Sequence, residues 1–255
     1  MSDYGDAWAG LYDAVHQQTE DIPFWIAEAQ RSGGPVLELA CGTGRVAIPM
    51  AQAGIPVVGL DSSPKLLAIA RAKAQRCKLP PGRLRFVRGD MRRFSLGRRF
   101  PLVIVPFRSF QLLLSVADQA QALAAIKEHL APEGRVIIDL FVPDADRILR
   151  EPGVRVFGRE RVDPATSHRL LIGEQNGYDT YNQVITARNI IEELDERGEL
   201  LRTMHVEYQL RYIYRFEMQH LLAANGFEVA DVYEGFDCEP LDEASTEMVW
   251  VAKAR

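Results

Sequence analysis

The sequence of 255 residues contains little cysteine, and this scarcity excludes two classes of protein. Its three cysteines, Cys41, Cys77 and Cys238, are odd in number, far apart and outside any Cys-x-x-Cys spacing. Neither a disulfide framework nor a zinc site is therefore indicated. We predict that the protein binds no metal.

Long apolar runs and an excess of basic residues are also missing. No apolar run approaches the length of a membrane span, and the N-terminus has no basic segment followed by an apolar one. The formal net charge of -5 argues against a polyanionic substrate, because nucleic-acid binders usually owe their affinity to a basic surface. These features predict a cytoplasmic protein that acts on neither nucleic acid nor membrane.

Seven arginines around one expected strand are the local exception to this acidic balance. We interpret them as the solvated edge of a sheet, where charges block pairing with another chain; an anion or partner patch is the alternative. The residues are Arg83, Arg85, Arg88, Arg92, Arg93, Arg98 and Arg99.

The first 141 residues contain alternating strand and helix patterns, which are typical of a doubly wound parallel sheet in an α/β protein. Strands are expected at 36–40, 56–60, 84–88, 101–106 and 134–141, and helices at 45–53, 63–76 and 117–130. Ser63-Pro64 predicts the start of the second helix, and Pro132-Glu133-Gly134 predicts a turn before the fifth strand.

After Pro143 the segments become rich in Val, Ile, Thr and Tyr, which predicts an antiparallel β insertion. Helical periodicity resumes near Tyr214, and strands at 227–234 and 246–253 resemble a terminal antiparallel hairpin. We expect a core at 1–143 and 212–255, with an insertion at 144–211 that covers the substrate site. The strands expected in the insertion are 154–162, 168–178, 182–195 and 199–210, separated at Asp163-Pro164, Asn176-Gly177 and Arg197-Gly198.

The most informative segment runs from Val36 to Arg45. A short apolar strand ends there in a turn that contains Gly42 and Gly44 and leads into a helix. Because glycine lacks a Cβ, a ligand can lie against this backbone and face the free N–H groups of the helix. The glycines also satisfy the loose dinucleotide pattern G-x-G-x-x-A, so they do not by themselves identify the cofactor.

Acidic residues at the ends of three consecutive strands narrow the choice. Glu38 precedes the turn, where a carboxylate would repel a pyrophosphate but would suit an ammonium group. Asp61 ends the second strand at the spacing of an acid that accepts hydrogen bonds from ribose hydroxyls. After the third strand, Asp90 suits the exocyclic amine of an adenine and Met91 suits its face. Ribose, adenine and ammonium together describe S-adenosylmethionine.

The chain resembles the class I S-adenosylmethionine-dependent methyltransferases in four motifs: Glu38–Arg45, Gly59–Ser63, Gly89–Met91 and Val103–Phe107. Ala40 stands where the first motif often has glycine. The resemblance implies a Rossmann-like seven-stranded sheet with S-adenosylmethionine as cofactor. It also implies that Glu38 and the Ala40 backbone hold the methionine amine, and Phe107 lines the methionine side. The complete set of expected cofactor residues is Glu38, Ala40, Gly42, Gly44, Arg45, Asp61, Ser62, Asp90, Met91, Pro106 and Phe107.

Candidate substrate residues follow the fourth strand, whose C-terminal end faces the transferring methyl in this fold. Arg108 is expected to clamp a carboxylate or phosphate, and Gln111 to orient a hydroxyl or amine. The alternatives are an ion pair of Arg108 with a local acid such as Asp139, and a helix cap for Gln111. Tyr212 and Tyr214, where the insertion rejoins the core, are candidates to hydrogen-bond the acceptor, with strand and helix packing as the alternative.

An aromatic stripe occupies one face of an expected N-terminal helix, because Tyr4, Trp8, Tyr12 and His16 recur at every fourth residue. Such a stripe is usually core packing. In related methyltransferases the N-terminal helix often closes over the cofactor, so Tyr12 is also a candidate to contact the cofactor carboxylate.

The resemblance implies an enzyme that moves a methyl group to N, O or C of a small metabolite by in-line displacement beneath a β cap. A homodimer is the assembly that we expect. The cap resembles those of sugar-amine N-methyltransferases. A noncatalytic S-adenosylmethionine-binding or scaffold protein is one alternative. An NAD(P)-dependent oxidoreductase is another, disfavoured by Glu38, by Gly89-Asp90-Met91 and by the hairpin. The acceptor and the need for a general base stay open.

Overall fold

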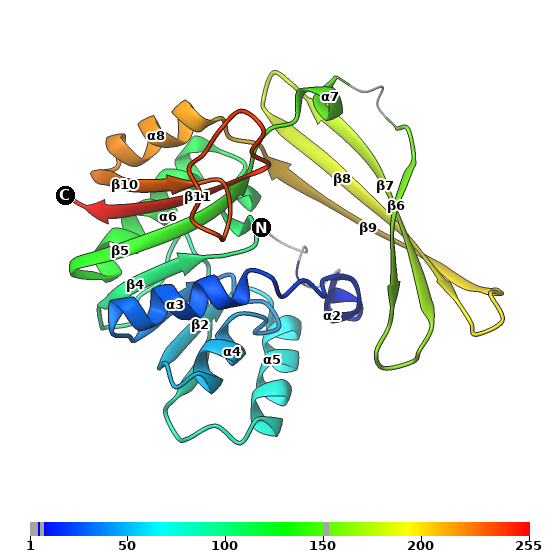
Figure 1. Cartoon of the computed structure of the whole chain (residues 1–255), viewed down its shortest axis with the longest axis horizontal. Coiled ribbons are helices and arrows are strands. Elements are labelled where there is room, and N and C mark those ends of the chain that lie inside the picture. Colours follow the sequence, from blue (N-terminus) through cyan, green and yellow to red (C-terminus); the bar gives the residue numbers. More distant parts are fainter. Residues whose placement is uncertain (1–4, 6–7, 150–152) are drawn as a thin grey trace.

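The computed structural model describes residues 5, 8–149 and 153–255, and its main element is a seven-stranded sheet in the order β10-β11-β5-β4-β1-β2-β3 (Figure 1). β1 to β5 are mutually parallel, and β11 is antiparallel to both β5 and β10. The predicted α/β fold with a terminal hairpin is confirmed, and β3 lies at an edge. The strands are β1 (Val36–Leu39), β2 (Val57–Asp61), β3 (Leu84–Arg88), β4 (Phe100–Val105), β5 (Leu130–Phe141), β10 (Phe227–Tyr233) and β11 (Glu247–Ala254).

Helices cover both faces of this sheet, so its central strands are buried on both sides and read as continuous apolar runs. α3 (Ile22–Ser32) and α4 (Ala47–Gln52) pack on one face. α6 (Val116–His129) and α8 (Arg215–Ala224) pack on the other. α5 (Pro64–Arg76) contacts β2 and β3. It starts as predicted, with the Ser63 side chain accepting a hydrogen bond from the Leu66 N–H.

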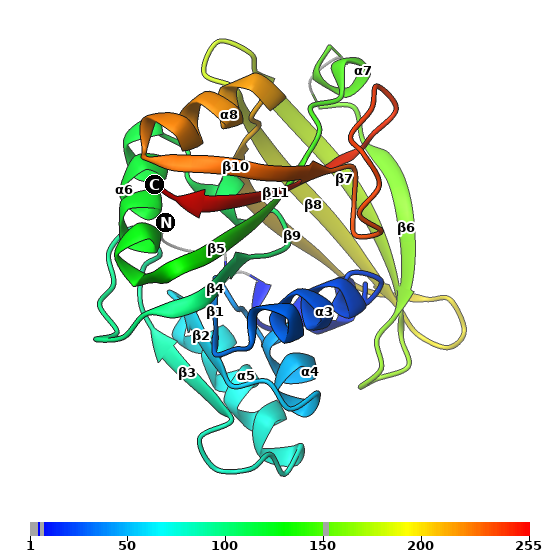
Figure 2. The same cartoon turned by 60° about the vertical axis from the view of Figure 1, so that its left-hand side comes forward.

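A separate antiparallel sheet in the order β6-β7-β8-β9 lies beside the end of the first sheet toward which the parallel strands point (Figure 1, Figure 2). Its strands are β6 (Val156–Val162), β7 (Arg169–Asp179), β8 (Val184–Leu194) and β9 (Leu200–Arg211), and the short helix α7 (Ala145–Ile148) leads into it from β5. The C-terminal ends of β1 to β5 thus face one side of this second sheet.

The short helix α2 (Tyr12–Val15) lies between the two sheets (Figure 1). Trp8 and Tyr12 pack in one apolar cluster with Leu66 of α5 and with Leu170 and Ile172 of β7. The aromatic stripe therefore joins the N-terminal segment to both sheets. Tyr4, the first member of the stripe, lies outside the described residues.

Two local expectations need correction, and one helix was not expected. Asn176-Gly177 is not a turn but lies inside β7, opposite Ala187 and Thr186 of β8. The chain reverses after Asp179, whose carboxylate accepts hydrogen bonds from the N–H groups of the second and third residues after it. The expected turn 132–134 falls within β5 and distorts it, because Glu133 has a φ of 61°. α3 was not predicted at all.

In the described part of the chain, no helix combines the length and the apolarity needed to cross a membrane.

Candidate functional site

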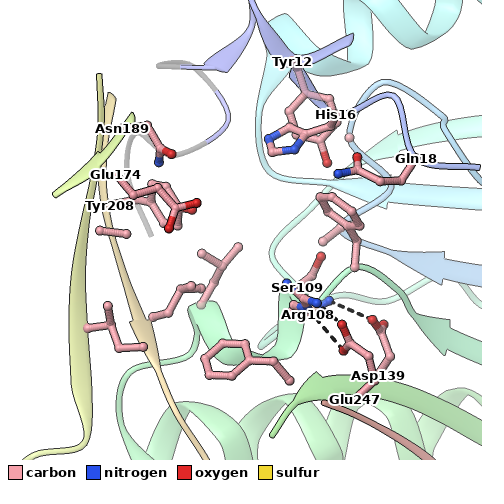
Figure 3. Close-up of a pocket in the computed structure, with 18 of the residues that line it drawn as sticks. Tyr12, His16, Gln18, Arg108, Ser109, Asp139, Glu174, Asn189, Tyr208 and Glu247 are labelled. Carbon is pink, nitrogen blue, oxygen red and sulfur yellow. Dashed lines mark hydrogen bonds and ion pairs between the residues drawn. The ribbon is translucent and has the colours of Figure 1, made fainter. Parts of the chain in front are cut away.

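A cavity of about 720 Å³ opens at the C-terminal ends of the parallel strands, between them and the second sheet (Figure 3). Its volume is in the range of small-molecule sites. The lining includes residues in the strands of the first sheet or in the segments that follow them: Ala40, Gly42, Asp61, Ser62, Met91, Phe107, Arg108 and Asp139. Across the cavity from Tyr12, His16 and Gln18 lie three residues of the second sheet, Glu174, Asn189 and Tyr208.

The turn after β1 brings its backbone to this cavity. Ala40 and Gly42 have φ values of 53°, and the Gly42 N–H donates a 2.8 Å hydrogen bond to Oδ2 of Asp61. The other oxygen of Asp61 accepts from the Ser63 N–H at 2.8 Å. Gly44 has a different role, because a Cβ there would lie 2.9 Å from Cδ1 of Ile48. Gly44 therefore serves close packing of the turn and is not among the lining residues.

Glu38 is 3% exposed and carries a carboxylate oxygen, Oε2, without a hydrogen-bond partner among the described residues. Burial raises the pKa of Glu38 to about 8, against the opposing effect of Arg45, while Asp61 raises it further. The Ala47 N–H hydrogen-bonds the same carboxyl group. Glu38 is not among the lining residues of the cavity, but its free oxygen next to this turn leaves an acceptor for a cationic or hydrogen-bonding group.

Arg45 does not line the cavity but holds the segment in front of it. Its guanidinium forms a bidentate pair with Asp21, with N–O distances of 2.6 and 2.7 Å, and donates to the Gln18 carbonyl at 3.0 Å. It also lies 4.6 Å from the ring centroid of Phe107. Arg45 therefore connects the N-terminal segment to the end of β4.

The end of β3 contributes Met91 but not Asp90 to the lining. The side chain of Arg92 donates to the Asp90 carboxylate at 2.6 Å and bridges it to Asp118. This hydrogen bonding lowers the pKa of Asp90. The expected adenine acceptor is thus already engaged by a neighbouring guanidinium.

Two consecutive residues with left-handed backbone follow β4: Phe107 with a φ of 59° and Arg108 with a φ of 60°. Such strain in non-glycine residues concentrates at functional sites. The Arg108 guanidinium pairs with Glu247 of β11, while its backbone N–H donates to Asp139 at 3.3 Å (Figure 3). Its ionic partner is therefore Glu247 rather than Asp139. Pro106 is not a lining residue; its carbonyl accepts from the Ser109 hydroxyl at 2.7 Å.

Three expected substrate residues do not line the cavity. Gln111 lies in the 3-10 helix η1 (Ser109–Leu112) and is fully buried; its amide donates to the Arg211 carbonyl at 3.3 Å and accepts from the Phe141 N–H at 3.1 Å. Tyr212 is 2% exposed within an apolar cluster, and Tyr214 precedes α8 and is half exposed. These residues lie where the second sheet joins the core and not in the cavity lining, so we leave them out of the proposed site.

His16 was noticed in the sequence only as a member of the aromatic stripe. Both of its ring nitrogens lack hydrogen-bond partners among the described residues. The centroid of its ring lies 4.7 Å from that of the Tyr12 ring and 5.2 Å from that of the Phe107 ring. Burial, with contributions from Arg159 and Arg45, lowers its pKa to about 4. The imidazole is therefore neutral at physiological pH.

Glu174, Asn189 and Tyr208 were not identified from the sequence. Glu174 of β7 lies opposite Asn189 of β8. Tyr208 of β9 lies opposite Ala187 of β8, and Ala187 is two residues before Asn189 in the sequence. Polar side chains on the inner face of an otherwise apolar sheet were the available signal, but period-two alternation does not reveal which face is inner.

The charge of the lining is predominantly negative. Seven carboxylic acids and three arginines line the cavity among the described residues. Each arginine pairs with one of these acids: Arg108 with Glu247, Arg147 with Asp144 and Arg159 with Glu174. The acids of the lining outnumber its arginines, and this excess favours a cationic occupant. The other four acids are Glu20, Asp21, Asp61 and Asp139. Of these, Asp21 is neutralised from behind by Arg45.

Comparison with known proteins agrees with this geometry. A family model described as a methyltransferase domain matches residues 36–134. A dTDP-3-amino-3,6-dideoxy-alpha-D-glucopyranose N,N-dimethyltransferase of Streptomyces fradiae is 34% identical over 147 residues, which cover 54% of this chain and 55% of that one. The chain spans about half the length of the curated relatives it matches first.

Solved structures are similar over nearly the whole chain. The CcbJ methyltransferase from Streptomyces caelestis has a TM-score of 0.78 and 28% identity, covering 98% of this chain and 97% of that one. The CalS10 amino pentose methyltransferase from Micromonospora echinaspora, solved with its cofactor bound, has a TM-score of 0.73 and 24% identity, covering 96% and 97%. The latter likeness concerns the fold. Residues 36–134 thus match a methyltransferase domain, and the chain is similar over nearly its whole length to a methyltransferase of known structure.

Proposed function

We propose that this protein transfers a methyl group from S-adenosylmethionine to an amine nitrogen of a small hydroxylated metabolite, with a sugar amine as the leading class. The observation that carries the choice of an amine is the excess of carboxylates in the cavity. A protonated amine and a sulfonium cofactor are both cations, and an acidic, partly buried cavity favours both. The name of the Streptomyces fradiae relative supports the sugar amine.

The cofactor fits the residues around the glycine turn. In the proposed arrangement the free oxygen of Glu38 accepts a hydrogen bond from the methionine ammonium, and the Ala40 and Gly42 backbone lies against the methionine. Asp61 and Ser62 face the ribose, and Met91 packs against the adenine. When bound, the cofactor supplies an electrophilic methyl group on a sulfonium.

Phe107 and Tyr12 line the cavity on the side of the proposed methionine position. Arg45 supports both, since it stacks on Phe107 and anchors the segment that follows Tyr12. Holding an acceptor nitrogen in line with the methyl group can account for roughly 7–11 kcal/mol of the barrier when orientation is complete. Orientation by these walls is therefore the main catalytic contribution that we assign to the protein.

The second sheet forms the acceptor side in this proposal. We treat 144–211 as an insertion that covers the substrate, with Glu174, Asn189 and Tyr208 facing the acceptor across the cavity from His16. Arg108 lies between the proposed cofactor side and the acceptor side of the cavity. Its side chain is half exposed and can bind an anionic part of the acceptor.

Product detection tests the proposal. The protein is incubated with methyl-labelled cofactor and matched pools of small hydroxylated amines and of alcohols, and label is expected only on amine nitrogen. Thermal stabilisation by S-adenosylmethionine or its demethylated product, but not by NAD, is expected in parallel. Binding without turnover on any pool would favour the scaffold alternative, and stabilisation by NAD alone would contradict the cofactor assignment.

Two finer expectations from the sequence, a cytoplasmic location and a homodimer, stay predictions. Sedimentation of the purified protein at several concentrations would test the second. A mass of one chain at all concentrations would contradict it.

A further inference from the structure

Asp139 is the carboxylic acid at the C-terminal end of β5, a position for which the proposed cofactor arrangement gives no role. It is 3% exposed and lines the cavity. β5 pairs with β4, which pairs with β1, so two strand spacings separate Asp139 from the glycine turn. At about 4.8 Å per strand this is roughly 10 Å across the sheet. The acid therefore lies on the far side of β4 from the glycine turn.

Only one oxygen of Asp139 is engaged. Oδ2 accepts the 3.3 Å hydrogen bond from the backbone N–H of Arg108, in the strained turn after β4. Oδ1 is buried and has no hydrogen-bond partner among the described residues. A buried carboxylate oxygen left without a donor costs free energy unless a ligand supplies one.

The charged groups around Asp139 come from four elements. Arg108 after β4 is the nearest cation, and it is shared with Glu247 of β11. Asp21, before α3, raises the pKa of Asp139, and Arg45, before α4, lowers it. Burial outweighs the two arginines and raises the pKa of Asp139 to about 7. An acid in this range can both accept and release a proton near neutral pH.

We propose that Oδ1 of Asp139 takes a proton from the ammonium group of the acceptor before methyl transfer. The nitrogen lone pair freed by that proton forms the N–C bond to the methyl group as the C–S bond breaks, and the electrons of the C–S bond stay on sulfur. The methylated nitrogen carries the positive charge that the sulfonium loses. Asp139 returns its proton to solvent when the product leaves. This inference rests on the proposed amine acceptor.

Two other groups in the cavity are less suited to this step. His16 has free ring nitrogens, but its lowered pKa makes it a weak proton acceptor, and it lies among the rings of Tyr12 and Phe107. Glu174 is on the second sheet and is paired with Arg159 at 3.0 Å. Among the described buried acids that line the cavity, Asp139 combines a free oxygen with a place at the end of a parallel strand.

The test compares Asp139→Asn with wild type on two acceptors of matched shape, one an alkyl amine that is protonated at neutral pH and one a weakly basic amine that is not. Asparagine keeps the acceptor for the Arg108 N–H but takes no proton. The expected loss in kcat is on the order of 10²- to 10⁴-fold for the alkyl amine and less than about tenfold for the weak base. Asp146→Asn, at an exposed acid of α7 outside the lining, is the matched control and is expected to lose nothing.

Two readouts separate a proton-transfer role from a structural one. Wild-type kcat/KM for the alkyl amine should rise as the pH increases through about 7, and this rise should vanish in Asp139→Asn. The affinity for S-adenosylmethionine, measured by calorimetry without acceptor, should be unchanged. Equal losses on both amines, or a pH profile abolished by His16→Gln instead, would overturn the role of Asp139. Wild type that methylates neither amine would overturn the proposed function together with this inference.

Discussion

Replacing Glu38 by glutamine should make the protein more stable and its cofactor binding weaker. Glu38 is fully enclosed beneath the glycine turn, and its pKa is raised from 4.5 to about 8 by burial. Glutamine has the shape of the protonated acid and can still accept the hydrogen bond from the Ala47 N–H. The substitution therefore removes an ionisable group that the folded state disfavours in its charged form.

The size of the stability gain follows from linkage. Because the folded pKa lies above the unfolded value, the contribution of Glu38 to stability is fully present below pH 4.5 and is lost as the pH rises to about 8. At pH 7 the loss amounts to roughly 3 kcal/mol. Glu38→Gln should recover up to that amount at pH 7 and little at pH 4.5. For a chain of this length the gain corresponds to roughly 5–10 °C in Tm.

Binding should change in the opposite direction. A hydrogen bond between the free oxygen of Glu38 and the methionine ammonium is charge-assisted, and losing it costs about 1.5–3 kcal/mol. Titration calorimetry should then give a Kd for S-adenosylmethionine that is roughly 10- to 100-fold higher. Opposite effects on stability and binding are typical of a functional residue.

Glu28→Gln provides the matched control. Glu28 is also a buried glutamate, 2% exposed, but it forms ion pairs with Arg31 and with Arg135, the latter at 3.1 Å. Its substitution should lower the Tm at pH 7 and leave cofactor affinity unchanged. Thermal unfolding of both variants between pH 4.5 and 8.5 checks the contrast. An unchanged or lower Tm for Glu38→Gln at pH 7, or unaltered cofactor affinity, would refute the reasoning.

Three further changes test the remaining parts of the site. Arg108→Lys should weaken acceptor binding, because lysine lacks the planar fork that matches a carboxylate or phosphate, and unchanged acceptor affinity in steady-state kinetics would exclude the clamp. Gln111→Leu leaves the Arg211 carbonyl and the Phe141 N–H unpaired, so it should lower the free energy of unfolding by about 1–3 kcal/mol for each of the two groups. Cofactor affinity should stay unchanged. Denaturant titration and calorimetry check this prediction, and weaker cofactor binding at full stability would contradict it. Deleting the residues before Ile22 should weaken S-adenosylmethionine binding without unfolding the seven-stranded sheet, and a deletion variant with native affinity by calorimetry would rule out a contact through Tyr12.

The core of the fold was predictable because its signals are local. β1 reads as an uninterrupted apolar run since both of its faces are buried, and the start of α5 is written in Ser63-Pro64. The acids at the strand ends could be recognised because the carboxyl ends of parallel strands meet at one edge. Glu38 lies in β1 opposite Gly59, and Asp61 is the last residue of β2.

The errors arose where partners come from distant parts of the chain. Gln111 was read as a substrate contact, but its amide is used by backbone groups of β5 and β9, which no local pattern reveals. Asn176-Gly177 resembles a hairpin turn, yet the pairing of β7 with β8 continues through it. Asp139 was considered only as an ion-pair partner, because the burial that gives it a possible chemical role depends on the packing of both sheets.

Transfer of a labelled methyl group tests the account most directly. The intact protein is supplied with S-adenosylmethionine labelled in its methyl group and with a hydroxylated amine beside the matching alcohol, and products are identified by mass spectrometry and NMR. The account predicts label on the amine nitrogen, with one demethylated cofactor formed for each methyl transferred. Label on oxygen or carbon, or no transfer by protein that calorimetry shows to bind the cofactor, would contradict it.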